Sequence, residues 1–408
     1  GGGGGGRMRK ISPGDVSRPR PRPSPPSSTL TLFFVVAAAA AIAIITQDAD
    51  VVEVDDDILP STRTPSSSSS QPTFKNYRKR RLQSISPPRK LYTRTPLVHS
   101  RTLSQRVGIP VYLKLEALQA TGSFKDRGLS EYLRHLRDDK GVKRVISSSG
   151  GNAGHAAAWA GNLLGLNVTV VVPESAPNFM VDKIRSHGAE VIVHGREWAN
   201  ADKLVRQMVD DDPESAYVTP FDHPVIWKGH KTIIDEIIED HRALLSSNSA
   251  VVCCVGGGGM LAGIYEGLIE GNCNNIKVIT AETQGASSFA QSVHSGRRVK
   301  LPSINTVAST LGAPQVAEGV INLMREHEGD TVAIGDVSDT EAVQACINFS
   351  NDHRLLVEPS CGAALSIVYN DRHHHLLKGL DSIVVIVCGG GGVNMDVLKE
   401  YQTQLMGT

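Results

Sequence analysis

One segment of the 408-residue chain reads Val251-Val-Cys-Cys-Val-Gly-Gly-Gly-Gly-Met260, an apolar β-branched run followed by four glycines. Such a run without polar alternation is typical of a strand buried on both faces of a parallel sheet. The residues from Leu261 onward predict a helix after the glycines. Four glycines let successive backbone N–H groups converge on a phosphate with no side chain in the way, so the loop is predicted to bind an anion.

Similar short runs recur from Leu91 to the end of the chain, with helical spacings between them. This alternation predicts an α/β fold of two open, twisted, mostly parallel sheets flanked by helices. Ligands of open α/β sheets bind at the carboxyl ends of the strands, so the chemistry is sought in the loops that follow them. The expected strands are 111–116, 144–147, 168–172, 191–193, 251–255, 277–281 and 383–387.

The composition sets limits on partners and compartment. The chain balances 42 Lys+Arg against 42 Asp+Glu, so no global field recruits nucleic acid. Its six cysteines include no C-x-x-C pair, and several lie within apolar runs. We therefore expect buried free thiols rather than disulfides, and a reducing, cytoplasmic setting.

Residues 1–90 have a different composition, with a glycine run, Arg/Pro alternation and the serine tract Ser66–Ser70. These cannot supply a packed core, so a disordered extension is predicted. Within it, the apolar run Leu30–Ile45 follows several basic residues, which is the layout of a signal anchor or signal peptide. As a helix it would span roughly 24 Å, short of the ~30 Å hydrocarbon core. A membrane-anchored or organelle-targeted protein remains the alternative to a cytoplasmic one.

Lys125 stands in the run Thr121-Gly-Ser-Phe-Lys-Asp-Arg-Gly128, directly after an expected strand. At the start of a helix, the dipole disfavours the protonated amine and leaves more free amine for attack on a carbonyl. The alternative is an ordinary solvated lysine, since most lysines are surface charges.

A second polar loop, Ser147-Ser-Ser-Gly-Gly-Asn-Ala-Gly154, joins an expected strand to a helix through Trp159. Hydroxyl, amide and free backbone N–H groups at a helix start can bind a carboxylate. A plain helix cap with glycines for close packing explains the same residues.

The glycine loop has a competing interpretation. Gly257, Gly259 and Ala262 match the dinucleotide pattern G-x-G-x-x-A, and Glu282 follows about 20 residues later, as a ribose ligand would. A nicotinamide or flavin enzyme is therefore an alternative at this stage. The absence of a G-K-[ST] ending excludes a nucleotide-triphosphatase loop.

A third loop places Cys388 between the run Ile383–Val387 and the glycines Gly389–Gly392. Alone, this cysteine is read as a buried core thiol. Together, a lysine, a carboxylate loop, a phosphate cradle and a polar atom at another strand end indicate one ligand with an aldehyde, a phosphate and a ring nitrogen. Pyridoxal 5'-phosphate meets that description.

At this point the sequence resembles the serine/threonine dehydratase family, which has the tryptophan synthase β-like fold. The resemblance covers Leu91 to the C-terminus. Its motifs are S-F-K-x-R-G at Ser123–Gly128, S-x-G-N-A at Ser149–Ala153, the Gly256–Met260 loop, E-P-x-C-G-A-A at Glu358–Ala364, V-C-G-G at Val387–Gly390, and the stretches Pro220–Pro224 and Ile226–His230.

The resemblance implies a role for each matching residue. Lys125 would bond covalently to pyridoxal phosphate and act as the catalytic base, and Phe124 would pack on the cofactor ring. The cofactor phosphate would be held by Gly256, Gly257, Gly258, Gly259 and Met260, and the ring would contact Asn152 and Cys388. The substrate carboxylate would be held by Ser149, Gly151, Asn152 and Ala153. A monovalent cation, potassium, would be bound by Glu282, Ala286, Ser288, Leu311 and Ala313.

The expected activity is elimination of water and ammonia from L-serine, and from L-threonine, giving a 2-oxoacid. The Cys388 thiol would be too weak an acid to keep the ring nitrogen of the cofactor protonated. The ring would then be a weaker electron sink, which suits elimination better than racemisation or transamination. The expected domains are a large cofactor-binding one (91–123 and 221–408) and a small substrate-binding one (124–220). The protein is expected to form a homodimer and to bind a small-molecule amino-acid substrate. The alternatives are a threonine synthase-like enzyme, a serine racemase or a non-catalytic binding protein.

Overall fold

A computed structural model describes residues 1–2 and 90–407 of the chain. The predicted extension and its apolar run Leu30–Ile45 lie almost entirely outside these residues. Within the described part, no helix is both long enough and apolar enough to cross a membrane.

The larger of two sheets has six strands in the order β1-β2-β10-β7-β8-β9. Only β1 runs antiparallel to its neighbour; the other pairs are parallel. The β7 residues Val251, Val252 and Cys253 are fully buried, as the unbroken apolar run predicted. The strands are β1 (Leu97–His99), β2 (Val111–Lys114), β7 (Ser249–Cys254), β8 (Lys277–Thr283), β9 (Thr331–Val337) and β10 (Ser382–Ile386).

The smaller sheet is wholly parallel, in the order β5-β4-β3-β6. Its strands are β3 (Arg144–Ser147), β4 (Asn167–Val172), β5 (Glu190–Val193) and β6 (Ser215–Val218). All four fall inside the range 124–220 that the sequence suggested for a small domain. One face packs on α7, through Ile146, Val171 and Val205, and the other packs on α4, α5 and α6.

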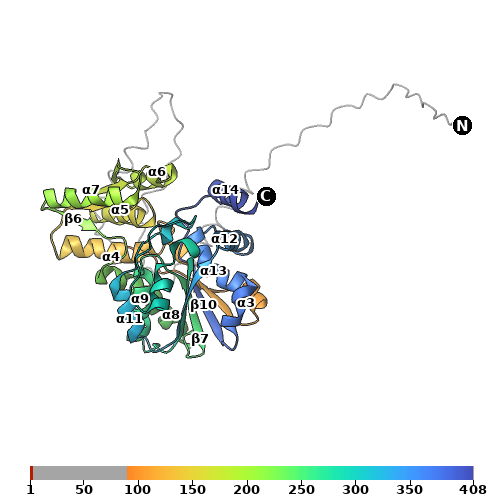
Figure 1. Cartoon of the computed structure of the whole chain (residues 1–408). Helices are drawn as coiled ribbons and strands as arrows, with labels where there is room; N and C mark the ends of the chain where they lie inside the picture. The colour runs from red at the N-terminus through yellow and green to blue at the C-terminus, as the bar shows by residue number, and fades with distance from the viewer. Residues whose placement is uncertain (3–89, 408) are drawn as a thin grey trace, which may run out of the picture. The chain divides into compact units, whose positions relative to one another are not determined.

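Helices flank both sheets, and Figure 1 shows α4 to α7 gathered around the small sheet and α8, α9 and α11 beside the large one. The helices are α3 (Arg101–Val107), α4 (Lys125–Asp138), α5 (Asn152–Leu164), α6 (Asn178–Ser186), α7 (Trp198–Asp211), α8 (Pro224–His241), α9 (Gly259–Glu270), α10 (Ser288–Ser295), α11 (Glu318–Glu326), α12 (Asp339–His353), α13 (Pro359–Tyr369) and α14 (Met395–Met406).

Glycines let three of these helices approach closely beneath the site. A Cβ added to Gly128 of α4 would lie 2.5 Å from the ring of His230 on α8, and one added to Gly263 of α9 would lie 2.6 Å from the His230 Cβ. These crossings fix the start of α4 against the large-sheet layer, because well-packed interiors do not absorb an extra methyl group without strain.

The predicted α/β class, the two mostly parallel sheets and the flanking helices are confirmed. All seven expected strands are present, although β2 ends at Lys114 rather than Glu116, and the helix after the glycine loop begins at Gly259 rather than Leu261. All six cysteines are free and buried, as expected. The histidines His373–His375 lie in a short 3-10 helix, Asp371–Leu377, with His373 buried.

Candidate active site

Lys125 is the first residue of α4, so the helix start expected there is confirmed, but β2 ends at Lys114 and a 3-10 helix, Glu116–Leu118, lies between the strand and the lysine. Its Nζ donates a hydrogen bond to the Pro220 carbonyl at 2.6 Å. Burial lowers the pKa of the Lys125 amine to about 8, and the charge of Glu358 opposes this shift only in part. Desolvation is therefore the main cause, and a substantial fraction of neutral amine exists near neutral pH.

The turn before Lys125 is held by backbone and carboxylate contacts. Asp126 accepts hydrogen bonds from the Thr121 N–H at 2.9 Å and from the Thr121 hydroxyl. The Phe124 N–H donates to the Cys388 carbonyl at 3.0 Å, and the Gly390 N–H donates to the Gly122 carbonyl at 3.0 Å. The lysine turn and the loop after β10 therefore form one unit.

Beneath this turn, Arg127 is completely buried between two carboxylates. Its guanidinium donates to Glu116 at 2.7 Å and to Glu236 at 2.7 Å. Lys114 donates to the same Glu236 at 2.5 Å, so the group holds two cations and two anions. A fully paired cluster avoids the cost of an uncompensated buried charge and ties α4 to β2 and α8.

The serine-rich loop after β3 brings Asn152 to the start of α5, where its Nδ2 donates to Glu358 Oε1 at 2.8 Å. Its Oδ1 is buried and has no hydrogen-bond partner among the described residues. Ser149 and Gly151 are partly buried, and Ala153 is buried behind them. The loop therefore presents an unsatisfied acceptor and a helix start to a ligand.

Glu358, the residue just before α13, anchors this loop. It also accepts hydrogen bonds from Thr310 Oγ1 at 2.6 Å and from the Gly392 N–H at 2.9 Å. Burial raises the pKa of its carboxyl, and the three donors partly offset that effect. The sequence interpretation quoted Glu358 in a motif but gave it no role; its place directly before the helix-starting Pro359 was the available signal.

The glycine loop after β7 is packed so closely that side chains are excluded. A Cβ on Gly257 would lie 2.4 Å from the Phe221 ring, and one on Gly259 would lie 2.7 Å from the Phe221 carbonyl oxygen. Gly258 has φ +89°, which favours glycine. No acceptor within the described residues pairs with the N–H groups of Gly257 and Gly258. The loop suits the predicted phosphate site.

The segment containing Pro220 and Phe221 connects Lys125 to the glycine loop, a role that the sequence interpretation missed. The carbonyl of Phe221 accepts from Trp227 Nε1 at 2.8 Å, which fixes the segment to α8. Pro220 accepts the hydrogen bond of the Lys125 amine, and Phe221 packs against the glycine loop. The amine and the glycine loop therefore both contact this one short segment.

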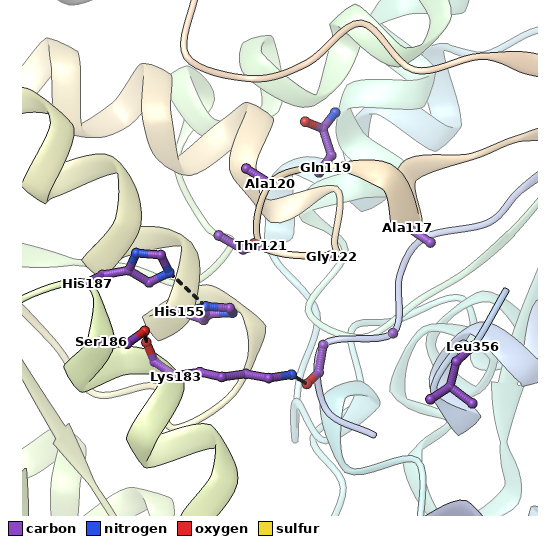
Figure 2. Close-up of a pocket in the computed structure, with 12 residues that line it drawn as sticks. Ala117, Gln119, Ala120, Thr121, Gly122, His155, Lys183, Ser186, His187 and Leu356 are labelled. Carbon is purple, nitrogen blue, oxygen red and sulfur yellow. Dashed lines mark hydrogen bonds between the residues drawn. The ribbon is translucent and has the colours of Figure 1, made fainter. Parts of the chain in front are cut away.

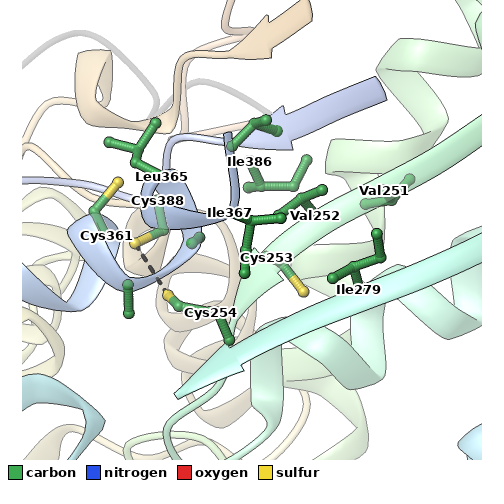
Figure 3. Packing of buried hydrophobic residues seen from close by; sticks show 14 of the residues in the cluster. Val251, Val252, Cys253, Cys254, Ile279, Cys361, Leu365, Ile367, Ile386 and Cys388 are labelled. Carbon is green, nitrogen blue, oxygen red and sulfur yellow. Dashed lines mark hydrogen bonds between the residues drawn. The ribbon is translucent and has the colours of Figure 1, made fainter. Parts of the chain in front are cut away.

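Cys388 lies just beyond the end of β10 with its Sγ 3.4 Å from Cys254 Sγ, as Figure 3 shows. Contacts with the neighbouring thiols of Cys254 and Cys361, together with burial, raise the pKa of the Cys388 thiol well above its usual range. The thiol is therefore neutral at physiological pH, as expected for a partner of an unprotonated ring nitrogen.

Three of the five residues predicted for a cation, Glu282, Ala286 and Ser288, lie at or contact the start of α10. Glu282, at the end of β8, accepts from the Phe289 N–H at 3.0 Å and the Ala290 N–H at 2.6 Å. Burial raises the pKa of its carboxyl to about 8. Ser288 Oγ is buried with no partner among the described residues. Ala286, Leu311 and Ala313 are buried too. The Glu282 carboxylate and the Ser288 hydroxyl offer oxygen ligands of the kind a hard cation takes, whereas the start of α10 favours anions and holds the carboxylate instead. Within residues 90–407 no cluster of three His, Cys, Asp or Glu forms a metal site.

These observations test whether pyridoxal phosphate fits the site. The desolvated Lys125 amine matches the aldehyde of the cofactor, and the unpaired N–H groups of the glycine loop match its phosphate. The unpaired amide oxygen of Asn152 matches a ring substituent, and the neutral Cys388 thiol matches the ring nitrogen. The dinucleotide alternative leaves Lys125 and the Ser149 loop without a role, and Glu282 accepts from α10 rather than facing the glycine loop.

Comparison with known proteins gives the same assignment. Residues 89–389 match the family described as "Pyridoxal-phosphate dependent enzyme". A "Serine dehydratase-like" protein of Rattus norvegicus is 42% identical over 317 residues, which cover 76% of this chain and 94% of that protein. An "L-serine dehydratase/L-threonine deaminase" of Bos taurus is 39% identical, covering 78% and 97%.

Among solved structures, a fungal L-serine ammonia-lyase from Rhizomucor miehei superposes with a TM-score of 0.72 at 32% identity, over 77% of this chain and 99% of that one. Maize serine racemase superposes with a TM-score of 0.69 at 26% identity, over 78% and 93%. The family match at residues 89–389 includes the three loops predicted to bind the cofactor and the substrate up to Gly389. The chain belongs to the family of pyridoxal-phosphate-dependent enzymes.

Proposed function

We propose that this chain is a lyase that removes water and ammonia from L-serine to give pyruvate, and from L-threonine to give 2-oxobutanoate. The observation that carries the proposal is the neutral Cys388 thiol beside the desolvated Lys125 amine. The names of the relatives at 39% and 42% identity support it.

When bound, pyridoxal phosphate supplies a conjugated ring that delocalises negative charge at the substrate Cα. The backbone N–H groups of Gly256–Met260 would hold its phosphate. Because burial keeps the Lys125 pKa near 8, the ε-amine can accept a proton at Cα and return it. Ser149, Gly151, Asn152 and Ala153 would hold and orient the substrate carboxylate.

The Cys388 thiol favours elimination because it does not transfer its proton to a ring nitrogen. Negative charge at Cα is then less stabilised, so loss of the β-hydroxyl competes well with reprotonation. A carboxylate at this position would favour the long-lived carbanion that racemisation requires.

The test uses the full chain loaded with pyridoxal phosphate. We expect a visible absorbance band, 2-oxoacid and ammonia from L-serine and L-threonine, and no accumulation of D-serine. Lys125→Ala should lose borohydride-dependent covalent attachment of the cofactor and at least about 10⁴-fold in kcat. A band without 2-oxoacid would exclude the lyase activity, and D-serine as the main product would establish a racemase instead.

We also propose potassium as the cation at Glu282, Ala286, Ser288, Leu311 and Ala313, supported by the buried carboxyl and the unpaired Ser288 hydroxyl. From the family resemblance we propose a homodimer, which light scattering of the purified chain tests.

A further inference from the structure

A cavity of about 440 Å³ is lined by residues of α5 and α6 and by the loops at Thr121–Gly122 and Gly390–Gly391. Figure 2 shows Lys183 and Ser186 of α6, with His187 just after that helix, on one side of it and the Thr121–Gly122 turn on the other. Its three titratable lining groups are all basic, and no Asp or Glu is among the described residues that line it. The cavity therefore has the lining of an anion site.

Lys183 has only partial charge compensation. Its Nζ donates to the Gly391 carbonyl at 2.9 Å, an uncharged acceptor. Glu358 attracts the ammonium at longer range, but its oxygens already accept from Asn152, Thr310 and the Gly392 N–H. Because burial lowers the Lys183 pKa, an anion in the cavity would stabilise the charged form.

His155 provides a second unpaired group. It is 6% exposed, and its Nε2 lies 3.1 Å from His187 Nε2, drawn as the dashed line in Figure 2. Its Nδ1 is buried with no hydrogen-bond partner in the described part of the chain. Burial, His187 and Lys183 together lower the His155 pKa to about 4, so the cavity holds a neutral imidazole that a bound carboxylate would help to protonate.

The cavity lies close to the predicted substrate loop, although none of the residues Ser149–Ala153 lines it. Gly391 lines it, and a Cβ added to Gly391 would lie 2.4 Å from Asn152 Oδ1. His155 lies one turn along α5 from Asn152. One glycine therefore separates the basic cavity from the amide expected to hold the substrate carboxylate.

We propose that this cavity binds the second carboxylate of a short dicarboxylic amino acid or 2-oxoacid, with the first carboxylate on the Ser149–Ala153 loop. The proposal rests on the proposed function for the position of the first carboxylate. Lys183 is the main ligand, exchanging the Gly391 carbonyl for the carboxylate, and His155 is the auxiliary one. A charged hydrogen bond in a partly buried site is stronger than a neutral one, so Lys183 gives selectivity for dianions.

The test compares succinate with butyrate, which has the same carbon count and one carboxylate, by calorimetry on the full chain with its cofactor. We expect succinate to bind at least about tenfold more tightly than butyrate, in the range of one charged hydrogen bond. Lys183→Met should remove the affinity advantage of succinate over butyrate, whereas Lys183→Arg should keep most of it. His155→Met should reduce the advantage. Lys203→Met, which removes an exposed lysine on α7, is the matched control and should leave it intact.

Equal affinities for the two acids, or a succinate advantage that survives in Lys183→Met, would overturn the proposal. The same preparation is assayed with L-serine. Loss of the serine reaction with selective succinate binding would reject the lyase but keep the cavity assignment, and the reverse result would reject the cavity alone.

Discussion

Two strand-to-helix turns in this chain face the same site but are built differently. The turn from β7 into α9 is four glycines, packed under Phe221 and bordered by Thr310. The turn from β3 into α5 places side chains at the site, and Glu358, just before α13, holds its Asn152. The first recognises through backbone N–H groups and rigid packing, and the second through a hydrogen-bond network. Cofactor affinity should therefore depend on the first and substrate turnover on the second.

The largest expected effect separates the turns directly. Gly257→Ala places a Cβ 2.4 Å from the Phe221 ring, whereas Gly151→Ala places one 3.7 Å from Thr310 Cγ2, an ordinary contact. We expect Gly257→Ala to weaken pyridoxal phosphate binding by about three orders of magnitude, because overpacking adds to lost phosphate hydrogen bonds. Gly151→Ala should stay within about threefold. Fluorescence titration of apoenzyme measures both, and equal losses would show that the turns are not distinct.

Changes to the hydrogen-bond network at the turn from β3 into α5 should alter turnover. Glu358→Ala leaves the buried donors of Asn152 and Thr310 without their acceptor, and we expect kcat/KM for L-serine to fall about a hundredfold while cofactor affinity changes little. Glu358→Gln keeps the shape and one acceptor oxygen, so it should lose less. The comparison fails if Glu358→Ala releases the cofactor as readily as Gly257→Ala does.

The same contrast explains which parts of the molecule the sequence predicted. Unbroken apolar runs followed by glycine or serine identified β3, β7 and β10 and the loops after them, because burial on both faces leaves a clear pattern. The short β1 at the sheet edge was missed, and so were β6 and β9, whose residues are largely only partly buried and mix polar with apolar side chains.

Within the site, Lys125, Asn152 and Cys388 were identified because each directly follows or closes a recognisable strand–loop unit. The contribution of Pro220 and Phe221 was not, because it depends on which distant loop they pack against. Glu358 likewise acquires its role from a contact 206 positions away in sequence. Local patterns predict which loops carry chemistry, but not the residues that position those loops.

Lys125 lies between the two turns, and its ionisation gives a smaller, pH-dependent effect. The folded-state pKa is lowered to about 8, so the reactive neutral amine forms as pH rises through 8 rather than through the usual 10.5. We expect the rate of covalent cofactor capture by apoenzyme to rise about tenfold from pH 7 to 9 and then level off. Stopped-flow absorbance measures this, with Nα-acetyl-lysine as a control that continues to rise. A midpoint near 10 would show that burial does not tune the amine.

The smallest effect should come from the cation. Two of its proposed ligands lie in the segment 309–313, which contacts both turns and belongs to neither. The Thr310 carbonyl oxygen would lie 3.0 Å from a Cβ on Gly256, and the Thr310 hydroxyl donates to Glu358. Without a cation, the Glu282 carboxyl has its pKa raised from 4.5 to about 8, so the folded state binds more protons than the unfolded state between these values. Stability contributed by the protonated form is therefore lost as pH rises from about 5 to 8.

Potassium should compensate that loss by stabilising the carboxylate. We expect potassium, relative to tetramethylammonium, to raise Tm by about 1–2 °C at pH 8, equivalent to about 1 kcal/mol, and by less at pH 6. Glu282→Gln should remove the pH dependence of the potassium-induced rise in Tm. Glu266→Gln is the control, because burial raises the pKa of that carboxyl too, to about 7, and it should keep the pH dependence. Because both turns border the 309–313 segment, the same titration should improve cofactor affinity and turnover together. An improvement in only one would place the cation's effect on a single turn.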